Sequence, residues 1–292
     1  MKDSIVRLLK RMLGINDLSL YIRKKKQKVE KLLYTKKYTA DDIIHVMEKC
    51  GVNPGHPLII HSAMGSLYNY VGTADELIDK IIDYLGPDGT LCMPAYPQNK
   101  FDDTQVFDVR NTPSAAGYLT EVFRRRAGVK RSLNQLHSVC AIGRDADLIT
   151  GEHHLSKTCF DEHSPYFIIG QLGGYSMSIG MPKWFVGTGE HVCESLLFGK
   201  LKFFTDKFDI KLTFQYLDKS GLEYKHEMNA KSSNPNAYVR SHSTLLFDKY
   251  FDSQKFVRYK LSNIWICCCD MKYLYTRLVS LAIEGKTIYK RI

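Results

Sequence analysis

The most regular pattern of apolar and polar positions lies between residues 57 and 95. A short apolar run at 57–60 is followed by polar and glycine residues, and a second apolar run occupies 90–95. Between them, apolar residues recur with the spacing of one helix face: Leu77, Ile78, Ile81, Ile82 and Leu85. A buried strand, a helix and a second buried strand in this order predict a βαβ unit with parallel strands and a right-handed crossover.

The ends of this helix also carry sequence signals. Thr73 is a good N-cap residue, and Glu76 stands at the third helical position, from which its carboxylate can bond back to the cap backbone. The turn sequence at 86–89, Gly-Pro-Asp-Gly, ends the helix. A similar helix is expected upstream, because Thr39 can cap its start and Gly51 its end.

The rest of the chain continues in the same way. The pattern predicts three more helices: 117–126, one that begins at Val192, and 273–282. It also predicts strands over three runs and a hairpin of two more: 137–142, 177–180, 262–268, and 210–217 with 222–227. We therefore expect an α/β fold with a mixed, largely parallel central sheet flanked by helices and a C-terminal antiparallel elaboration. Residues 39–292 are expected to form a single domain, since no repeat or low-complexity linker interrupts them.

Charge changes this picture only for the first 40 residues. The net charge is +10, and residues 1–40 hold 12 Lys or Arg against three acidic residues, so the remainder is nearly neutral. This distribution argues against a nucleic-acid surface on the folded body. A short basic helix is expected over 4–13, and a second basic stretch follows at 21–33. We therefore expect residues 1–38 to form a basic helical arm. The arm either packs on the body with its charges in solvent, associates weakly with an anionic membrane surface, or contacts a partner or nucleic acid.

Cysteine usage and apolar run lengths bear on location. The eight cysteines include no C-x-x-C pair and suit a reducing compartment. No apolar run reaches the roughly 18 residues of a membrane span, and basic residues interrupt the N-terminal apolar stretch. We expect a cytoplasmic protein without a metal site. Cys267 to Cys269 should form part of a buried strand, and the His153-His154 pair should be solvated in a loop.

Several short motifs are more specific as a set than any is alone, because their order and spacing agree. In chain order they are 60–67 (IHSAMGSL), Val71-Gly72, 85–94 (LGPDGTLCMP), Phe107-Asp108, Thr112-Pro113-Ser114, 121–124 (EVFR), Arg131-Ser132, His137-Ser138, Ser164-Pro165 and 188–194 (TGEHVCE). Together they resemble the aminoglycoside 3-N-acetyltransferases, which have the antibiotic N-acetyltransferase fold, over about residues 40–200. The resemblance implies an N-acetyltransferase with acetyl-CoA as co-substrate.

The first of these motifs has properties that suit an anionic ligand. A strand end rich in serine and glycine, followed by a capped helix start, offers hydroxyl groups, backbone N–H groups and a positive dipole. The resemblance implies that this loop and the Thr-Pro-Ser segment contact the cofactor, which gives the candidates His61, Ser62, Ala63, Met64, Ser66, Gly72, Thr73, Thr112 and Ser114. The alternative is that Thr73 is only a helix cap and Ser114 only a turn residue.

His191 is the candidate general base. An amine at neutral pH is mostly an ammonium ion, so a group that titrates near pH 7 must remove its proton before it attacks a thioester. The resemblance implies that an acidic residue on a downstream strand orients this histidine, and Glu227 is preferred for that position. Glu194 is the alternative, because it would share a helix face with His191. An acyl-enzyme on Cys193 is not expected, since adjacent helical residues point apart.

The sequence differs from the family at positions that would contact the acceptor substrate. A Gly-His-Asp run of the antibiotic-modifying members is replaced here by 181–185 (MPKWF), and a His-Pro pair is replaced by Asn134-Gln135, although His137 remains. Basic and aromatic groups suit a diphosphate better than a polycation. We therefore expect His137, Lys183 and Trp184 to contact a nucleotide-linked amino deoxysugar. The alternatives are an aminoglycoside acceptor and a non-catalytic binding protein with the same fold.

Overall fold

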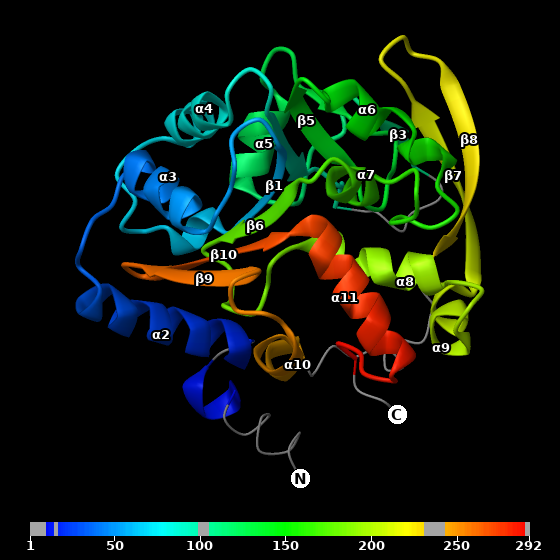
Figure 1. Cartoon of the computed structure of the whole chain (residues 1–292). Helices are drawn as coiled ribbons and strands as arrows, with labels where there is room; N and C mark the ends of the chain where they lie inside the picture. Colours follow the sequence, from blue (N-terminus) through cyan, green and yellow to red (C-terminus); the bar gives the residue numbers. More distant parts are fainter. Residues whose placement is uncertain (1–9, 15–16, 99–104, 231–242, 290–292) are drawn as a thin grey trace.

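The computed structural model describes residues 10–14, 17–98, 105–230 and 243–289, and a seven-stranded sheet runs through its middle (Figure 1). The strands lie in this order: β4 (Lys130–Arg131), β5 (Val139–Gly143), β2 (Thr90–Pro94), β1 (Pro57–Ser62), β6 (Tyr175–Ile179), β10 (Ile264–Asp270) and β9 (Phe256–Leu261). The central strands β2, β1 and β6 are parallel, whereas the neighbours on both sides pair antiparallel. The expected mixed sheet is confirmed, with parallel pairing confined to its centre.

The predicted βαβ unit is present as β1, α4 (Ala74–Leu85) and β2. Both strands are buried almost throughout, as expected of strands with helices on both faces. The capping box at the start of α4 is also confirmed, because the Thr73 side chain accepts from the Glu76 backbone N–H and the Glu76 carboxylate accepts from the Thr73 N–H. Upstream, α3 (Ala40–Lys49) begins after Thr39 as expected.

Each face of the large sheet has its own hydrophobic core. One core is covered by α3, α4 and α5 (Tyr118–Arg124). The other is covered by α6 (Ala146–Gly151), α7 (Pro165–Gln171), α8 (Val192–Leu197) and α11 (Met271–Ile283). The cysteine run on β10 alternates between the two cores, with Cys268 in the first and Cys267 and Cys269 in the second. The predicted buried strand is therefore confirmed.

A second sheet of three strands extends from the second core (Figure 1). The predicted hairpin forms as β7 (Ile210–Leu217) and β8 (Glu223–Ala230), and Asp218 in its turn accepts bonds from the Ser220 and Leu222 backbone. The short strand β3 (Val106–Asp108) pairs parallel with β7. This hairpin is the antiparallel elaboration that the sequence predicts.

The remaining elements refine the sequence-based boundaries. Strand β9 was not expected, and β10 begins two residues later than the predicted strand. The predicted helix 4–13 lies mostly outside the described residues, and α2 covers the second basic stretch. The other elements are α2 (Leu18–Leu33), η1 (Met64–Ser66), η2 (His153–Leu155), η3 (Thr188–His191), α9 (Lys202–Thr205), η4 (Asp206–Phe208) and α10 (Ser243–Tyr250). Within the described ranges, no helix is both long and apolar enough to span a bilayer.

Candidate active site

The loop between β6 and α8 brings His191 to the junction of η3 and α8. Gly187 in this loop has a φ of 140°, and a side chain there would come within 2.4 Å of the Ser176 Oγ atom and 2.8 Å of the His61 ring. Only glycine allows the chain to pass so close to β1 and β6 at this φ. The close approach fixes the start of the turn that carries His191.

His191 lies between two buried carboxylates. Its Nδ1 atom is 2.7 Å from Glu194 Oε1, and its Nε2 atom is 3.7 Å from Glu190 Oε1. The hydrogen-bond pattern assigns the proton of the neutral ring to Nδ1, which leaves the Nε2 lone pair free to accept another. The imidazole side chain remains 24% exposed, whereas the carboxylates are almost completely buried. The imidazole that carries the proton-accepting atom is therefore in contact with solvent.

Glu194 is held by two further side chains from distant segments. Lys207 of η4 donates to its Oε2 atom, and the Tyr289 hydroxyl donates to its Oε1 atom. Burial raises the pKa of the Glu194 carboxyl, but the charges of His191 and Lys207 more than offset that effect and hold the pKa well below its usual range. Burial, aided by the Glu194 charge, raises the pKa of Tyr289 far above its usual value, so its hydroxyl keeps its proton. Glu194 is therefore an ionised carboxylate with fixed partners.

Aromatic rings line the site beside His191. The Phe160 ring lies 5.4 Å from the His191 ring, 4.5 Å from the His137 ring and 5.1 Å from the Tyr166 ring, measured between centroids. The His137 ring in turn lies 5.9 Å from that of Tyr96. His137, expected to contact the acceptor, is therefore separated from His191 by a single ring.

His61 supports the turn that carries His191. Its Nε2 atom accepts from the Thr188 backbone N–H at 3.0 Å and lies 2.7 Å from the Thr188 hydroxyl oxygen. Burial lowers the pKa of His61 to about 3, so the ring is neutral. Because this nitrogen is committed to Thr188, the structure places His61 under the loop as a positioning group.

A model of the family described as aminoglycoside 3-N-acetyltransferase matches residues 59–274. The chain belongs to the aminoglycoside 3-N-acetyltransferase family. Among relatives, it is 25% identical over 166 residues to aminoglycoside N(3)-acetyltransferase III of Pseudomonas aeruginosa, an alignment that covers 50% of this chain and 59% of that enzyme. The chain therefore spans little more than half the length of this curated relative.

Solved structures of aminoglycoside acetyltransferases share the fold. The crystal structure of AAC(3)-Xa superposes with a TM-score of 0.72 at 19% identity, covering 90% of this chain and 99% of that one. The binary complex of AAC-IIIb with CoASH gives a TM-score of 0.70 at 18% identity, covering 86% and 98%. The α/β class with a mixed sheet that the sequence predicts is therefore confirmed at the level of the fold.

The structure places the two candidate orienting acids differently. Glu227, which the sequence analysis preferred, is exposed on β8 opposite Thr213 and forms no hydrogen bond or ion pair with the described residues. The acid beside His191 is Glu194, from the same turn. Lys207 and Tyr289 were missed because they lie 13 and 95 residues from Glu194, beyond any local spacing rule.

The candidate cofactor residues fall into two groups by their contacts. Ser62, Ala63, Met64 and Ser66 are partly buried where β1 leads into η1. The Ser62 carbonyl lies 3.5 Å from where a Gly117 side chain would begin, so the end of β1 meets the start of α5. The second group consists of Gly72, Thr73, Thr112 and Ser114, which lie in turns or at a helix start.

In this second group, polar atoms satisfy their own turns. The Thr112 hydroxyl accepts from the Asp108 N–H, and the Ser114 hydroxyl accepts from the Ala116 N–H. Gly72 and Thr73 are exposed at the start of α4, where the Thr73 hydroxyl is engaged by Glu76. The turn and cap roles considered for Ser114 and Thr73 are therefore present, whatever else these residues bind.

The remaining candidates lie in contrasting places. Lys183 is exposed, and the half-buried Trp184 ring packs against Phe185, whose ring contacts that of His61. Cys193 is buried, its Sγ donates to the Glu190 carbonyl, and burial raises its thiol pKa well above the usual value, which disfavours a nucleophilic role.

One expectation about histidines was wrong. His153 is not solvated: its ring is buried, with Nδ1 2.9 Å from the Ser132 hydroxyl and Nε2 3.0 Å from the Cys159 carbonyl. In the described part of the chain, no group of three His, Cys, Asp or Glu side chains is arranged to hold a metal ion.

Proposed function

We propose that the chain transfers the acetyl group of acetyl-CoA to an amine of an amino sugar, with His191 as the general base. The observation that carries the proposal is the 2.7 Å contact of His191 Nδ1 with a buried, ionised Glu194, while the His191 side chain stays 24% exposed. Family membership and the CoASH complex of AAC-IIIb support acetyl-CoA as the donor.

In the proposed reaction, an ammonium acceptor first releases one proton to solvent. The nitrogen of the neutral amine then bonds to the thioester carbonyl carbon while the Nε2 atom of His191 takes one of its remaining protons. The carbon–sulfur bond breaks, and the proton on the imidazolium passes to the CoA thiolate, which leaves a neutral amide and the CoA thiol. Glu194 stabilises the imidazolium between these two proton transfers, since its carboxylate contacts the opposite ring nitrogen. Lys207 and Tyr289 keep that carboxylate in place.

The charges next to His191 favour a cationic acceptor. Glu190 and Glu194 flank the ring, and Lys207 donates to Glu194. A carboxylate 3.7 Å from Nε2 is well placed to attract an ammonium group. The relatives are also named for aminoglycosides. For both reasons, an aminoglycoside amine is the acceptor that we place first.

A nucleotide-linked amino deoxysugar is the second acceptor class. The exposed Lys183 and the half-buried Trp184 stand close in sequence to the loop that His61 supports. There the lysine could contact a diphosphate and the tryptophan ring could stack on a nucleobase. This class predicts a much lower KM for the nucleotide-linked sugar than for the free sugar.

A panel assay tests both the activity and the acceptor. Thiol release from acetyl-CoA is measured with aminoglycosides, free amino sugars and nucleotide-linked amino sugars, each against a control without acceptor. We expect acceptor-dependent release with at least one class and acetylated amine in the product by mass spectrometry. If no amine raises thiol release while CoA still binds, the chain is a binding protein and the proposed activity is wrong.

A further inference from the structure

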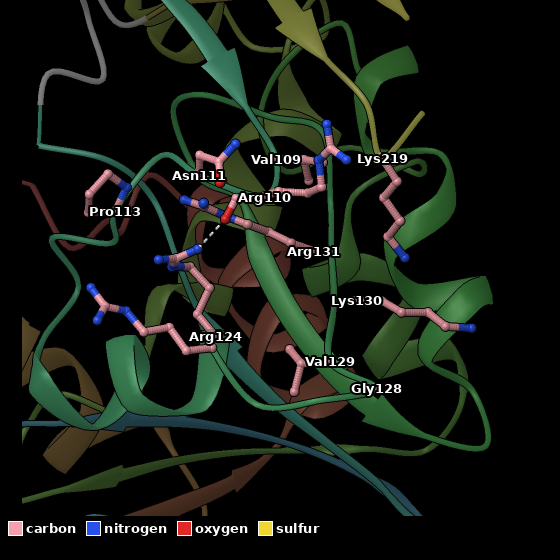
Figure 2. A pocket seen from close by; sticks show the side chains of 11 residues that line it. Val109, Arg110, Asn111, Pro113, Arg124, Gly128, Val129, Lys130, Arg131 and Lys219 are labelled. Carbon is pink, nitrogen blue, oxygen red and sulfur yellow. Dashed lines mark hydrogen bonds between the residues drawn. The ribbon is translucent and has the colours of Figure 1, made fainter. Parts of the chain in front are cut away.

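Basic side chains gather around one cavity and on one helix. Figure 2 shows Arg124 and Lys130 beside the cavity, which has a volume of about 660 Å³. Carboxylates lie next to both, since Arg124 pairs with Glu121 and Lys130 with Asp147. The helix is α2, whose 16 residues include six Lys or Arg and one acid, Glu30. On α2 the basic residues accompany exposed apolar side chains, so this helix presents both charge and apolar area to solvent.

One side of α2 faces the body of the protein. The Nζ atom of Lys31 lies 5.3 Å from the centre of the Tyr68 ring, and the carbonyl of Tyr34, just after the helix, accepts from the side chain of Asn69. Burial, aided by the Glu30 charge, raises the pKa of Tyr68, so Glu30 stands on this side as well. The helix therefore contacts the loop after η1 through charged residues.

The opposite side of α2 is apolar. Ile22 precedes Lys31 by about two and a half turns and so lies across the helix from it. Val29 and Leu33 follow Ile22 by nearly whole turns, and with Leu32 they form what we call the outer face of α2. These side chains are 57% (Ile22), 55% (Val29), 80% (Leu32) and 71% (Leu33) exposed. A helix on a globular body normally turns its apolar side inward, so α2 has the reverse orientation.

Lysines accompany the outer face. Lys25 lies within the apolar row, three residues after Ile22 and four before Val29. Lys24 and Lys28, one turn apart, continue one edge of it, and all three lysines are exposed. Long lysine side chains can reach an anionic layer while the apolar groups between them enter a less polar one. This arrangement suits a surface with an apolar interior beneath anionic groups.

Charge decides between the possible occupants of this face. Two copies of α2 packed face to face would bring Lys25 of each copy into the contact, with further lysines at its edge, and like charges repel. A nucleic acid would pair with the lysines but would leave the four apolar side chains against sugars and phosphates. A bilayer with anionic lipids complements both the lysines and the apolar groups.

We propose that α2 lies on the surface of an anionic lipid membrane, with its outer face toward the bilayer. Ile22, Val29, Leu32 and Leu33 then enter the boundary between headgroups and acyl chains, and the lysines contact the headgroup phosphates. Helix α2 precedes residues 59–274, which match the family. The inference is therefore independent of the proposed function, and its test requires no acetyl transfer.

The test measures the partition of the full chain onto vesicles of mixed phosphatidylserine and phosphatidylcholine by co-sedimentation. Leu32→Gln with Leu33→Gln removes two apolar groups of the outer face, and glutamine retains a high helix propensity. The partition coefficient should fall about tenfold or more. The matched control is Leu148→Gln with Leu222→Gln, since both side chains are 57% exposed but lie on the body. Its partition should equal that of the unsubstituted chain.

A second variant tests the contribution of charge. Lys24→Gln with Lys28→Gln should lower the partition onto the mixed vesicles about tenfold. The unsubstituted chain should bind pure phosphatidylcholine vesicles much more weakly than the mixed ones, and higher salt should weaken its binding to the mixed vesicles. Far-UV circular dichroism checks that every variant keeps its helix content.

Three results would overturn the proposal. If the leucine variant binds the mixed vesicles as the unsubstituted chain does, the outer face does not enter the bilayer. Equal binding of the unsubstituted chain to both kinds of vesicle would exclude a role for anionic lipid. If the chain binds neither kind but forms a dimer that the leucine substitutions dissociate, a second copy covers the outer face instead.

Discussion

The contact between His191 Nδ1 and Glu194 Oε1 determines which ring nitrogen can receive a proton in the proposed reaction. A histidine held in this way presents Nε2 to the acceptor, and its imidazolium form is stabilised by the same carboxylate. Because Glu194 is buried and anchored by Lys207 and Tyr289, neither its charge nor its position depends on solvent. The acid is therefore part of the rigid interior, although the base is partly exposed.

Paired substitutions of the two acids test this assignment. We expect Glu194→Gln to lower kcat on the order of a hundredfold, since an amide cannot balance the charge of the imidazolium. Glu227→Gln should leave kcat unchanged, because Glu227 is exposed on β8 and forms no side-chain hydrogen bond or ion pair with the described residues. Steady-state rates with both variants at saturating substrates provide the measurement. The reverse ranking would return Glu227 to the role of orienting acid.

Buried neutral histidines give a pH dependence of stability. Burial lowers the pKa of His153 to about 3, below the value of 6.5 for a free side chain. The unfolded chain therefore binds the proton first, so the contribution of the neutral ring is complete above pH 6.5 and is lost as the pH falls. From this residue, we expect a loss of up to about 1.4 kcal/mol per pH unit.

Urea unfolding at pH 7, 6 and 5 checks the contribution of His153. His153→Gln should flatten the decrease in the free energy of unfolding relative to the unsubstituted chain. His45→Gln is the control, since the His45 side chain is 63% exposed and should not alter the slope. Equal slopes for all three proteins would contradict a neutral, buried His153.

At the level of single residues, the sequence predicts the site where its signals are local. The TGEHVCE motif places His191 and Glu194 three residues apart, and one helical turn is enough to bring them together. Lys207 and Tyr289 could not be predicted, because only the packing of η4 and the C-terminal segment against α8 brings them to Glu194. The burial of His153 likewise depends on Ser132 and Cys159 from other segments.

The elements follow the sequence where stability is encoded locally. The apolar stripe and the capping box of α4 predict its bounds, and the βαβ unit follows from them. Strand β9 was missed because Arg258 and Lys260 interrupt its apolar pattern and it forms an edge that depends on β10. The antiparallel direction of the flanking strands was also not encoded locally, since buried strands of either direction appear as apolar runs.

Thr73 offers a test at the scale of an element. Its hydroxyl accepts from the Glu76 N–H at 3.1 Å, so Thr73→Ala should lower the free energy of unfolding by about 1 kcal/mol. We expect an unchanged KM for acetyl-CoA, because the cap engages the hydroxyl and two acidic side chains occupy the first turn. Thermal unfolding and steady-state kinetics measure the two effects. A raised KM with unchanged stability would instead make Thr73 a cofactor contact.

Across the whole molecule, the basic arm is set apart from the nearly neutral body. Helix α2 of this arm exposes both apolar and basic side chains, among them Ile22, Val29, Leu32 and Lys28. Figure 1 shows α2 beside the edge of the sheet formed by β9. Exposed apolar groups next to lysines are typical of helices that lie on anionic membranes.

Removal of residues 1–36 tests the role of the arm. We expect kcat to persist, because the residues around His191 all lie far beyond the arm in sequence. Co-sedimentation with vesicles that contain anionic lipid should fall, and neutral vesicles are the control. If the shortened chain sediments with anionic vesicles as the full chain does, the arm does not bind the membrane and only packs on the body. If the shortened chain loses turnover, the arm is needed for catalysis.

The most direct measurement of the central claim is the turnover of His191→Ala together with its Kd for CoA. The account predicts a kcat lower by about 10²- to 10⁴-fold, because the acceptor amine loses its base, and a Kd for CoA within error of the unsubstituted chain. A kcat close to that of the unsubstituted chain would contradict the role of His191. A matching loss of CoA binding would show that the substitution removes the binding site rather than the base.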